Sequence, residues 1–137
     1  MPRPRPLLLL LLLVPLAWGE PALVVNPDVT QRSIDRDTLR AIFGMRRSQW
    51  PDGRPIRVFV LPDRAPLHRE FCKRVLGVFP HQLRRAWDRA VFSGTGQAPE
   101  QLDGVEAMRR RIAETPGAIG YLPEERIDER VRRLDLE

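Results

Sequence analysis

Short apolar runs separated by polar turns mark the candidate strands of this chain. The run ALVVN ends in Asn-Pro, and the run IRVFVL ends at a further proline. Both runs are almost continuously hydrophobic, which is typical of strands that are covered on both faces. A third apolar run, AIGYL, follows a Pro-Gly turn. The predicted strands are 22–26, 56–61, 118–122 and, more weakly, 131–136.

The segments between these runs carry apolar residues at helical spacing. Asp35 is a candidate N-cap for a first helix with Leu39, Ile42 and Phe43 on one face, and we expect Gly44 to end it in the left-handed conformation. Further helices are predicted from Pro66 to Gly77, from Pro80 to Ser93 and from Gly104 to Glu114.

The helix that begins at Pro80 has the most regular apolar pattern, so we expect it to lie on the core. Its apolar residues are Leu83, Ala86, Trp87, Ala90 and Val91. Strands that alternate with helices predict an α/β fold, here a single lobe of three layers. With 137 residues, 42% of them hydrophobic, the chain has room for one core, and it shows no internal repeat and no second domain.

The first 19 residues have the layout of a secretory signal peptide. Two arginines precede an apolar run at 7–18, and Ala17 and Gly19 place small residues at positions −3 and −1 of a cleavage site. A transmembrane helix needs about 20 apolar residues, and this run is shorter. The sequence therefore predicts a signal peptide at 1–19 and one domain at 20–137.

Charge and cysteine content change the picture only slightly. The formal charge of +5 at first suggests a nucleic-acid partner, but residues 1–19 hold two arginines and no acid, which leaves +3 on the other 118 residues. The arginine clusters are not interleaved with aromatic residues, so no nucleic-acid binding is expected. The lone Cys72 cannot form an intrachain disulfide, and export without disulfides favours a bacterial periplasm.

Three segments of the chain together resemble a known family. They are LRAIFGMRRSQWPDGRPI at 39–56, Glu70-Phe71 with the helix of Trp87, and TPGAIGYL at 115–122. They resemble phosphate-type substrate-binding proteins of bacterial ABC transporters, in which L-x-x-I-F-x-G-x-x-x-x-W precedes a strand and P-G-A-I-G-Y follows much later. Here the glycine is displaced and the first segment is one residue shorter. The resemblance implies one lobe of a type II periplasmic binding protein-like fold.

Two glycines of the last segment have physical roles that do not depend on the resemblance. Pro116-Gly117 is expected to stop a helix and reverse the chain. Gly120 interrupts a strand and is expected to leave room for another backbone or for a ring such as Trp87 or Tyr121. These are structural roles, so the resemblance supports a fold more firmly than an activity.

The resemblance also implies a phosphate site between the second strand and the next helix. The family places an arginine, an aspartate and a Ser-Gly-Thr sequence there, four residues before a phenylalanine. With Phe71 as the anchor, Asp63 matches the aspartate, Leu61 stands at the arginine position and Ala65-Pro66-Leu67 replaces Ser-Gly-Thr. The loss of two hydroxyls, one backbone N–H and one guanidinium predicts that phosphate binding is weakened or lost.

Four nearby residues remain as candidate ligands for a loosely held anion, with a solvated loop as the alternative. They are Asp63, Arg64, His68 and Arg69. The i, i+4 pair of His68 and Cys72 has no third ligand or orienting acid at a telling spacing, so we expect a surface imidazole beside a semi-buried thiol. The tripeptide Ser93-Gly94-Thr95 matches the family's hydroxyl motif, but it follows a helix end and is expected to be structural.

Two functions remain open at this point. The first is an exported, periplasmic solute-binding-like protein whose ligand, if any, is a small oxyanion such as phosphate. The alternative is a protein-interaction module of the cell envelope that docks an envelope or transporter protein or a second copy of itself. No catalytic residue, metal site or cofactor is predicted, and 118 residues match only one lobe of a two-lobed receptor.

Overall fold

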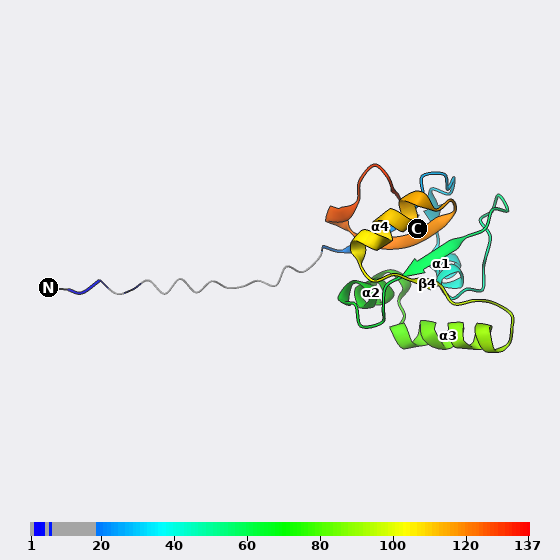
Figure 1. Ribbon diagram of the computed structural model, residues 1–137, viewed down its shortest axis with the longest axis horizontal. Helices are drawn as coiled ribbons and strands as arrows, with labels where there is room; N and C mark the ends of the chain where they lie inside the picture. Colours follow the sequence, from blue (N-terminus) through cyan, green and yellow to red (C-terminus); the bar gives the residue numbers. More distant parts are fainter. Residues whose placement is uncertain (1, 5, 7–18) are drawn as a thin grey trace.

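The computed structural model describes residues 2–4, 6 and 19–137 (Figure 1). The apolar run of the predicted signal peptide lies outside these residues, and no helix among them is long and apolar enough to cross a membrane. The strands are β1 (Pro21–Val25), β2 (Ser33–Ile34), β3 (Arg57–Val60), β4 (Glu100–Gln101), β5 (Ala118–Pro123), β6 (Arg132–Arg133) and β7 (Asp135–Leu136). The helices are α1 (Arg36–Phe43), α2 (Pro66–Phe71), the π-helical turn η1 (Cys72–Leu76), α3 (Pro80–Phe92), α4 (Val105–Glu114) and the 3-10 turn η2 (Glu124–Arg126).

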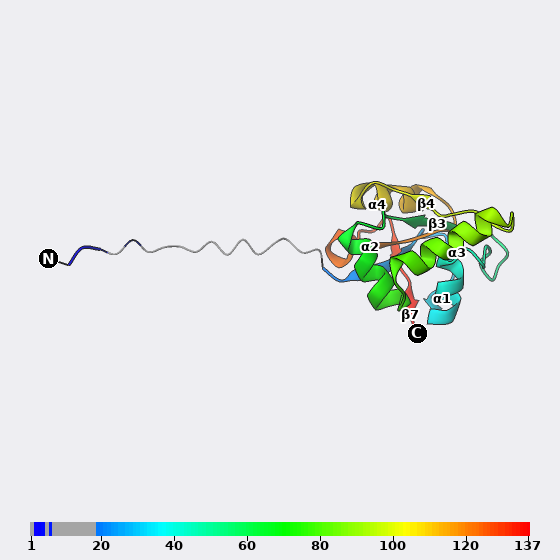
Figure 2. The ribbon, with the colours of Figure 1, turned by 90° about the horizontal axis from the view of Figure 1, so that it is seen from below.

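Five strands form one mixed sheet in the order β4-β3-β5-β1-β6. The central strand β5 is parallel to β3 and antiparallel to β1, with Val24 opposite Gly120. Helix α4 packs on one face of the sheet, and α1, α2 and α3 lie on the other side (Figure 2). The three predicted apolar strands and the α/β lobe of three layers are therefore confirmed.

Strand β5 is buried along its whole length and presents alternate residues to the two helical layers. Tyr121 stacks on Phe71 of α2, with the ring centroids 4.1 Å apart, while Gly120 faces α4. A Cβ at Gly120 would lie 2.7 Å from both Ile112 Cδ1 and Met108 Sδ. The expectation of a ring against Gly120 is therefore wrong, because the close neighbours are two flexible side chains of α4.

Helix α1 begins as predicted and ends differently. The Asp35 carboxylate accepts a hydrogen bond from the Thr38 N–H at 3.1 Å, and the three predicted core residues of the helix are buried. Gly44 has a right-handed conformation with φ −77°, and the positive φ of 62° falls on Met45. A Cβ at Gly44 would lie 2.9 Å from the Arg40 carbonyl oxygen, so the glycine provides space rather than left-handed geometry.

The predicted helix starts at Pro66 as α2, continues as η1 and ends at a left-handed Gly77 with φ 68°, as predicted. Between Cys72 and Leu76 the backbone widens into a π-helical turn, which the sequence pattern did not indicate. The turn keeps one face in the core, since both of these residues are fully buried. Such single π turns are rare in helices.

Helix α3 packs on the core over a narrower face than predicted. Only Leu83 and Trp87 are buried, and the Trp87 Nε1–H donates to the Phe43 carbonyl at 2.7 Å. Val91 is 53% exposed and Phe92 is 95% exposed. The helix lies at the lower edge of the fold in Figure 1 and crosses the front of it in Figure 2, so the apolar residues at its end have no core to meet.

The C-terminal segment forms two very short strands where one was predicted. β6 pairs with β1 in the main sheet, and β7 pairs in parallel with β2 in a separate two-stranded sheet. Leu134 lies between them, is buried, and donates its N–H to the Leu23 carbonyl at 3.0 Å. A single buried residue thus divides the segment between two sheets.

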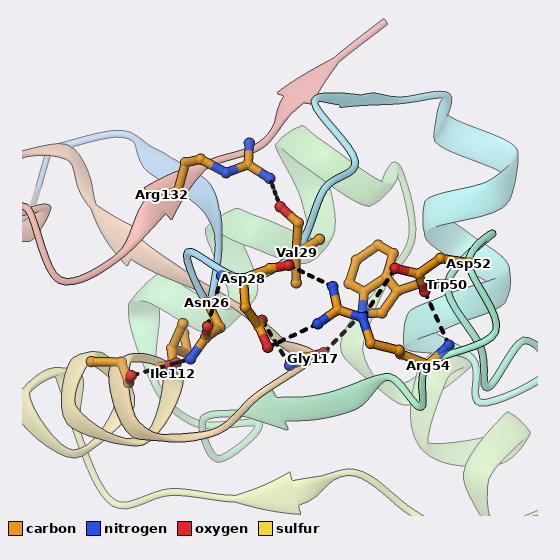
Figure 3. Close-up of polar contacts among 10 residues, drawn as sticks. Asn26, Asp28, Val29, Trp50, Asp52, Arg54, Ile112, Gly117 and Arg132 are labelled. Atoms are coloured by element: carbon orange, nitrogen blue, oxygen red, sulfur yellow. Dashed lines mark hydrogen bonds and ion pairs between the residues drawn. The ribbon is translucent and has the colours of Figure 1, made fainter.

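Two of the segments that carry the family resemblance meet at Gly117 (Figure 3). Its carbonyl accepts a hydrogen bond from Trp50 Nε1 at 3.0 Å, and its N–H donates to the Asp28 carboxylate at 3.2 Å. Arg54 bridges the Asp28 and Asp52 carboxylates, at 3.0 Å each. The Trp-Pro-Asp-Gly-Arg turn and the Pro-Gly turn are therefore locked to one another.

Steric constraints at Gly117 allow only glycine there. Its φ is 75°, and a Cβ would lie 2.3 Å from the Pro55 carbonyl oxygen. Gly53 has a φ of 89°, but a Cβ there would meet nothing within 4 Å. The two glycines share a left-handed backbone and differ in available space.

We expect Gly117→Ala to destabilise the protein far more than Gly53→Ala. The left-handed backbone alone costs an alanine about 1–2 kcal/mol, and at Gly117 the clash with the backbone of Pro55 adds to that cost. In urea unfolding, Gly117→Ala should therefore lower the free energy of unfolding by at least about 2 kcal/mol more than Gly53→Ala does. Equal losses in the two variants would contradict the packing argument.

Candidate functional site

The candidate site lies where β3 ends and α2 and α4 begin. In open α/β sheets, ligands bind beyond the carboxyl ends of the strands, at this kind of position. A groove of about 450 Å³ is present here, and we call it the β3–α2 groove. Its lining residues are Leu61, Ala65, Pro66, Leu67, Asp103, Gly104, Val105, Glu106, Ala107 and Arg126.

The first turn of α2 offers few donors to an anion. Ala65 is the N-cap and makes no side-chain cap hydrogen bond, and Pro66 has no N–H. Leu61 and Leu67 are buried apolar residues. The positions that the family fills with a guanidinium and two hydroxyls therefore form an apolar wall in this chain.

Asp63, the one matching residue, is already engaged by a cation. Its two carboxylate oxygens accept hydrogen bonds from Arg84 Nε at 2.6 Å and Arg84 Nη2 at 3.2 Å. The hydrogen bonds from Arg84 lower the pKa of Asp63 below its usual value. Because α3 supplies this guanidinium, the carboxylate is ionised and its charge is neutralised within the fold.

The other three predicted ligand residues do not form a site with Asp63. Arg64 and Arg69 are exposed, and neither side chain makes a hydrogen bond or ion pair with a described residue. His68 Nε2 lies 3.7 Å from Asp63 Oδ1, but the ring is completely buried. The expected surface imidazole is therefore wrong, because the helix turns His68 toward the sheet.

His68 belongs to a buried polar cluster around the hydroxyl of Tyr121. The Leu61 N–H donates to this hydroxyl at 2.8 Å, so the hydroxyl proton is directed to His68 Nδ1. The imidazole proton is then on Nε2, which faces Cys72 Sγ at 3.5 Å and Asp63 at 3.7 Å. This cluster satisfies the polar groups of α2 that are turned into the core.

The cluster contains cysteine, histidine and aspartate, but it is not arranged for nucleophilic catalysis. Cys72 is completely buried, and burial raises the pKa of its thiol to about 12. Cys72 and Asp63 also approach the same nitrogen, Nε2 of His68, whereas a catalytic triad places the nucleophile and the orienting acid on opposite nitrogens of the histidine base. Within the described residues, no group of three or more His, Cys, Asp or Glu side chains could hold a metal ion.

The tripeptide Ser93-Gly94-Thr95 ends α3, as predicted. Gly94 has a φ of 70°, and Ser93 Oγ donates to the Arg89 carbonyl at 2.7 Å. The Ser93 and Thr95 hydroxyls lie 2.8 Å apart and hydrogen-bond to one another. The hydroxyls thus close the helix C-terminus instead of facing a ligand.

Sequence reasoning missed two residues that define the state of this site. Tyr121 is the only tyrosine of the chain and lies in an apolar strand, so the need to satisfy its hydroxyl was a usable indication of a buried polar partner. Arg84 lies 21 residues from Asp63, and no spacing rule connects them. That pair depends on how α3 crosses α2, which only the structure shows.

The buried histidine predicts a pH-dependent stability. Burial lowers the pKa of His68 below 6.5, so the unfolded chain binds a proton in a pH range where the folded chain does not. The free energy of unfolding should therefore fall as the pH drops from 7.5 to about 5.5, by up to about 1.4 kcal/mol per pH unit. The groups facing His68 are Tyr121, Cys72, Asp63 and Arg84. The contribution of Asp63 is lost only below its ordinary pKa of 3.8.

We expect His68→Gln to flatten this pH dependence and His81→Gln to leave it unchanged, because His81 is exposed. Urea unfolding of each variant at pH 7.5 and 5.5 gives the difference directly, even though His68→Gln also lowers stability at both pH values. A full pH dependence retained in His68→Gln would refute the assignment.

Comparison with known proteins gives structural neighbours only. No family model and no curated protein sequence matches the chain. An ABC-type phosphate transport receptor from Vibrio cholerae superposes with a TM-score of 0.67 at 14% identity, covering 88% of this chain and 47% of that one. PstS from Borrelia burgdorferi gives 0.66 at 14% identity, with 88% and 48% covered.

A further neighbour is a putative phosphate ABC transporter substrate-binding protein with bound phosphate from Clostridium perfringens. It superposes with a TM-score of 0.69 at 16% identity, covering 88% of this chain and 46% of its own. The chain thus spans a little under half the length of these three neighbours. Its fold is the one found in the substrate-binding proteins of phosphate ABC transporters, in a form that corresponds to a single lobe.

Proposed function

We propose that this chain is an exported, non-enzymatic protein of the substrate-binding-protein fold that no longer holds phosphate tightly and acts by docking another protein. The fold of its neighbours supports a role in transport or sensing rather than catalysis. The layout of residues 1–19 supports export to the periplasm. The apolar wall of the β3–α2 groove and the Asp63–Arg84 ion pair support the loss of tight phosphate binding.

The observation that carries this proposal is the ion pair between Asp63 and Arg84. A desolvated phosphate needs several converging donors, and a guanidinium contributes most when it forms two parallel hydrogen bonds to the anion. The guanidinium of Arg84, which reaches this site from α3, makes that bidentate contact with Asp63 instead. Phosphate would have to compete with a carboxylate that the fold already holds in place.

The far side of the groove adds to this argument, since it is acidic. Asp103 precedes α4, Glu106 lies in its first turn, and both line the groove. Glu106 forms ion pairs with Arg109 and Arg126, so the nearby cations are engaged as well. An anion in the groove would meet apolar side chains on one side and carboxylates on the other, and both disfavour it.

Weak oxyanion binding is a second candidate function, favoured by one observation. Arg64, before α2, and Arg69, on α2, are exposed and make no ion pair with a described residue. Two solvated guanidinium groups can attract an anion without desolvating it, which gives a loose and salt-sensitive contact.

A phosphate titration separates these functions. We expect the thermal midpoint of residues 19–137 to stay unchanged up to about 1 mM phosphate or sulfate, because a ligand stabilises only in proportion to its occupancy of the native state. A shift that appears only at higher concentration, and that Arg64→Ala with Arg69→Ala removes, would support the loose contact. A saturable shift at micromolar phosphate would refute the proposed function.

A donor-restored variant tests the reason for the loss. Ala65→Ser, Pro66→Gly and Leu67→Thr together return two hydroxyls and one backbone N–H to the first turn of α2. We expect this variant to show a phosphate-dependent thermal shift that the unmodified chain lacks. Ser93→Ala with Thr95→Ala is the matched control, since those hydroxyls lie at the end of α3 and should not alter the response.

A further inference from the structure

A second groove, larger than the one at the phosphate position, lies between the end of α1 and the outward side of α3. Its volume is about 680 Å³, and we call it the α1–α3 groove. It belongs to the part of the molecule where α3 lies at the lower edge of the fold (Figure 1). Neither the fold nor the loss of phosphate binding accounts for it.

The floor of this groove is apolar, and several of its side chains are small. Met45 and Val78 contribute apolar surface, and Gly44, Ala86 and Ala90 are small residues along the two helices. Small residues let another backbone approach a helix closely, which is the requirement for a helix or strand laid along the groove. These alanines are the part of the α3 pattern that the core does not use.

The rim of the groove is basic. Arg40, Arg46 and Arg89 line it, and none of its described lining residues is acidic. Arg40 is partly engaged, since its Nε donates to the Leu76 carbonyl at 2.6 Å and its Nη1 lies 3.6 Å from Asp37. Arg46 and Arg89 are exposed and form no ion pair with a described residue.

Arg46 and Arg89 differ from the arginines near the phosphate position, because they have no carboxylate partner among the described residues. There, Arg84 is paired with Asp63 and Arg126 is paired with Glu106. In the α1–α3 groove two guanidinium groups stand free above an apolar floor, which is the charge complement of an acidic, partly apolar ligand.

Charge also decides between the possible occupants. The apolar leader of this chain carries Arg3 and Arg5 and no acid, so the rim would repel it. A second copy would bring a surface with net charge +3, and many of its carboxylates are already paired with arginines, as in Glu124–Arg133 and Glu100–Arg111. A flat lipid surface would not fill a concave site between two helices.

We propose that the α1–α3 groove binds an acidic, partly apolar peptide segment of a partner protein. The α3 face that lines it runs from Gln82 to Ser93, a rise of about 16 Å, which matches a segment of about three helical turns. Carboxylates of the segment pair with Arg46 and Arg89, and its apolar residues cover Met45 and Ala90. The site deepens the proposed function, since it names the chemistry of the docking partner.

Selection from a random peptide library tests this proposal without assuming a partner. Residues 19–137, which contain every described strand and helix, are immobilised and used to select from displayed peptides of about 16 residues. We expect enrichment of Asp and Glu together with apolar residues at helical spacing. No enrichment, or enrichment of basic peptides, would overturn the proposal.

Charge-reversed variants locate the binding site. Arg46→Glu with Arg89→Glu should weaken binding of the selected peptides at least about tenfold in fluorescence anisotropy, because two attractions become repulsions. The matched control is Arg57→Glu with Arg110→Glu, two exposed arginines elsewhere that also form no ion pair with a described residue. An equal loss in the control would overturn the assignment to the groove.

Two further measurements keep the test decisive if the groove variant folds poorly. For the unmodified chain, about 0.5 M NaCl should weaken the selected peptides strongly, since the rim charges are exposed. Binding of vesicles of anionic phosphatidylglycerol without peptide selection, or dimerisation that is lost in the groove variant, would replace the peptide partner with a membrane or a second copy. The phosphate titration reports on the other groove, so failure of the proposed function appears separately.

Discussion

The contact between Trp50 and Gly117 is the constraint on which the rest of the structure depends. It joins two turns that are 67 residues apart, through the indole N–H and the Gly117 carbonyl, at the point where β5 enters the sheet. Because the backbone there leaves no space for a Cβ, the turn can be closed only by glycine. β5 then enters beside β1 and β3 and carries Tyr121 and Gly120 to opposite helical layers. The sequence features that resemble the binding-protein family are thus the features that assemble its sheet.

The turns that assemble the sheet and the residues that line the β3–α2 groove are different parts of the molecule. The turns at Trp50 and Gly117 lie away from the β3–α2 groove and are required by the sheet, whatever occupies that groove. The anion donors that the sequence resemblance implies belong to one helical turn, and this chain has Ala65, Pro66 and Leu67 there. Proline suits the first turn of a helix, and leucine adds buried apolar surface. Fold and binding site are therefore separable in this molecule.

Patterns within one element could be predicted from the sequence, and relations between elements could not. The strands near β1, β3 and β5, the Asp35 cap and the Pro66 start follow from local chemistry, and the structure confirms them. Gly44 does not take the expected left-handed conformation, which falls on Met45, because a close carbonyl and not a left-handed turn required the glycine. The burial of His68 depended on which side of α2 meets the sheet. Its partner Tyr121 lies 53 residues away, which is beyond the reach of any periodicity.

Helix α3 contributes one arginine near each groove. Arg84 is paired with a carboxylate, and Arg89 has no described carboxylate partner. From one side the helix extends Arg84 to Asp63, which neutralises the one carboxylate that matches the phosphate site implied by the sequence resemblance. From another side it presents Arg89, with Arg46 across the groove, without any described carboxylate. Two buried side chains, Leu83 and Trp87, hold the helix on the core, together with one indole hydrogen bond and the Arg84–Asp63 ion pair. The small share of its surface in the core and the division of its cations support the proposal that α3 contacts a partner protein.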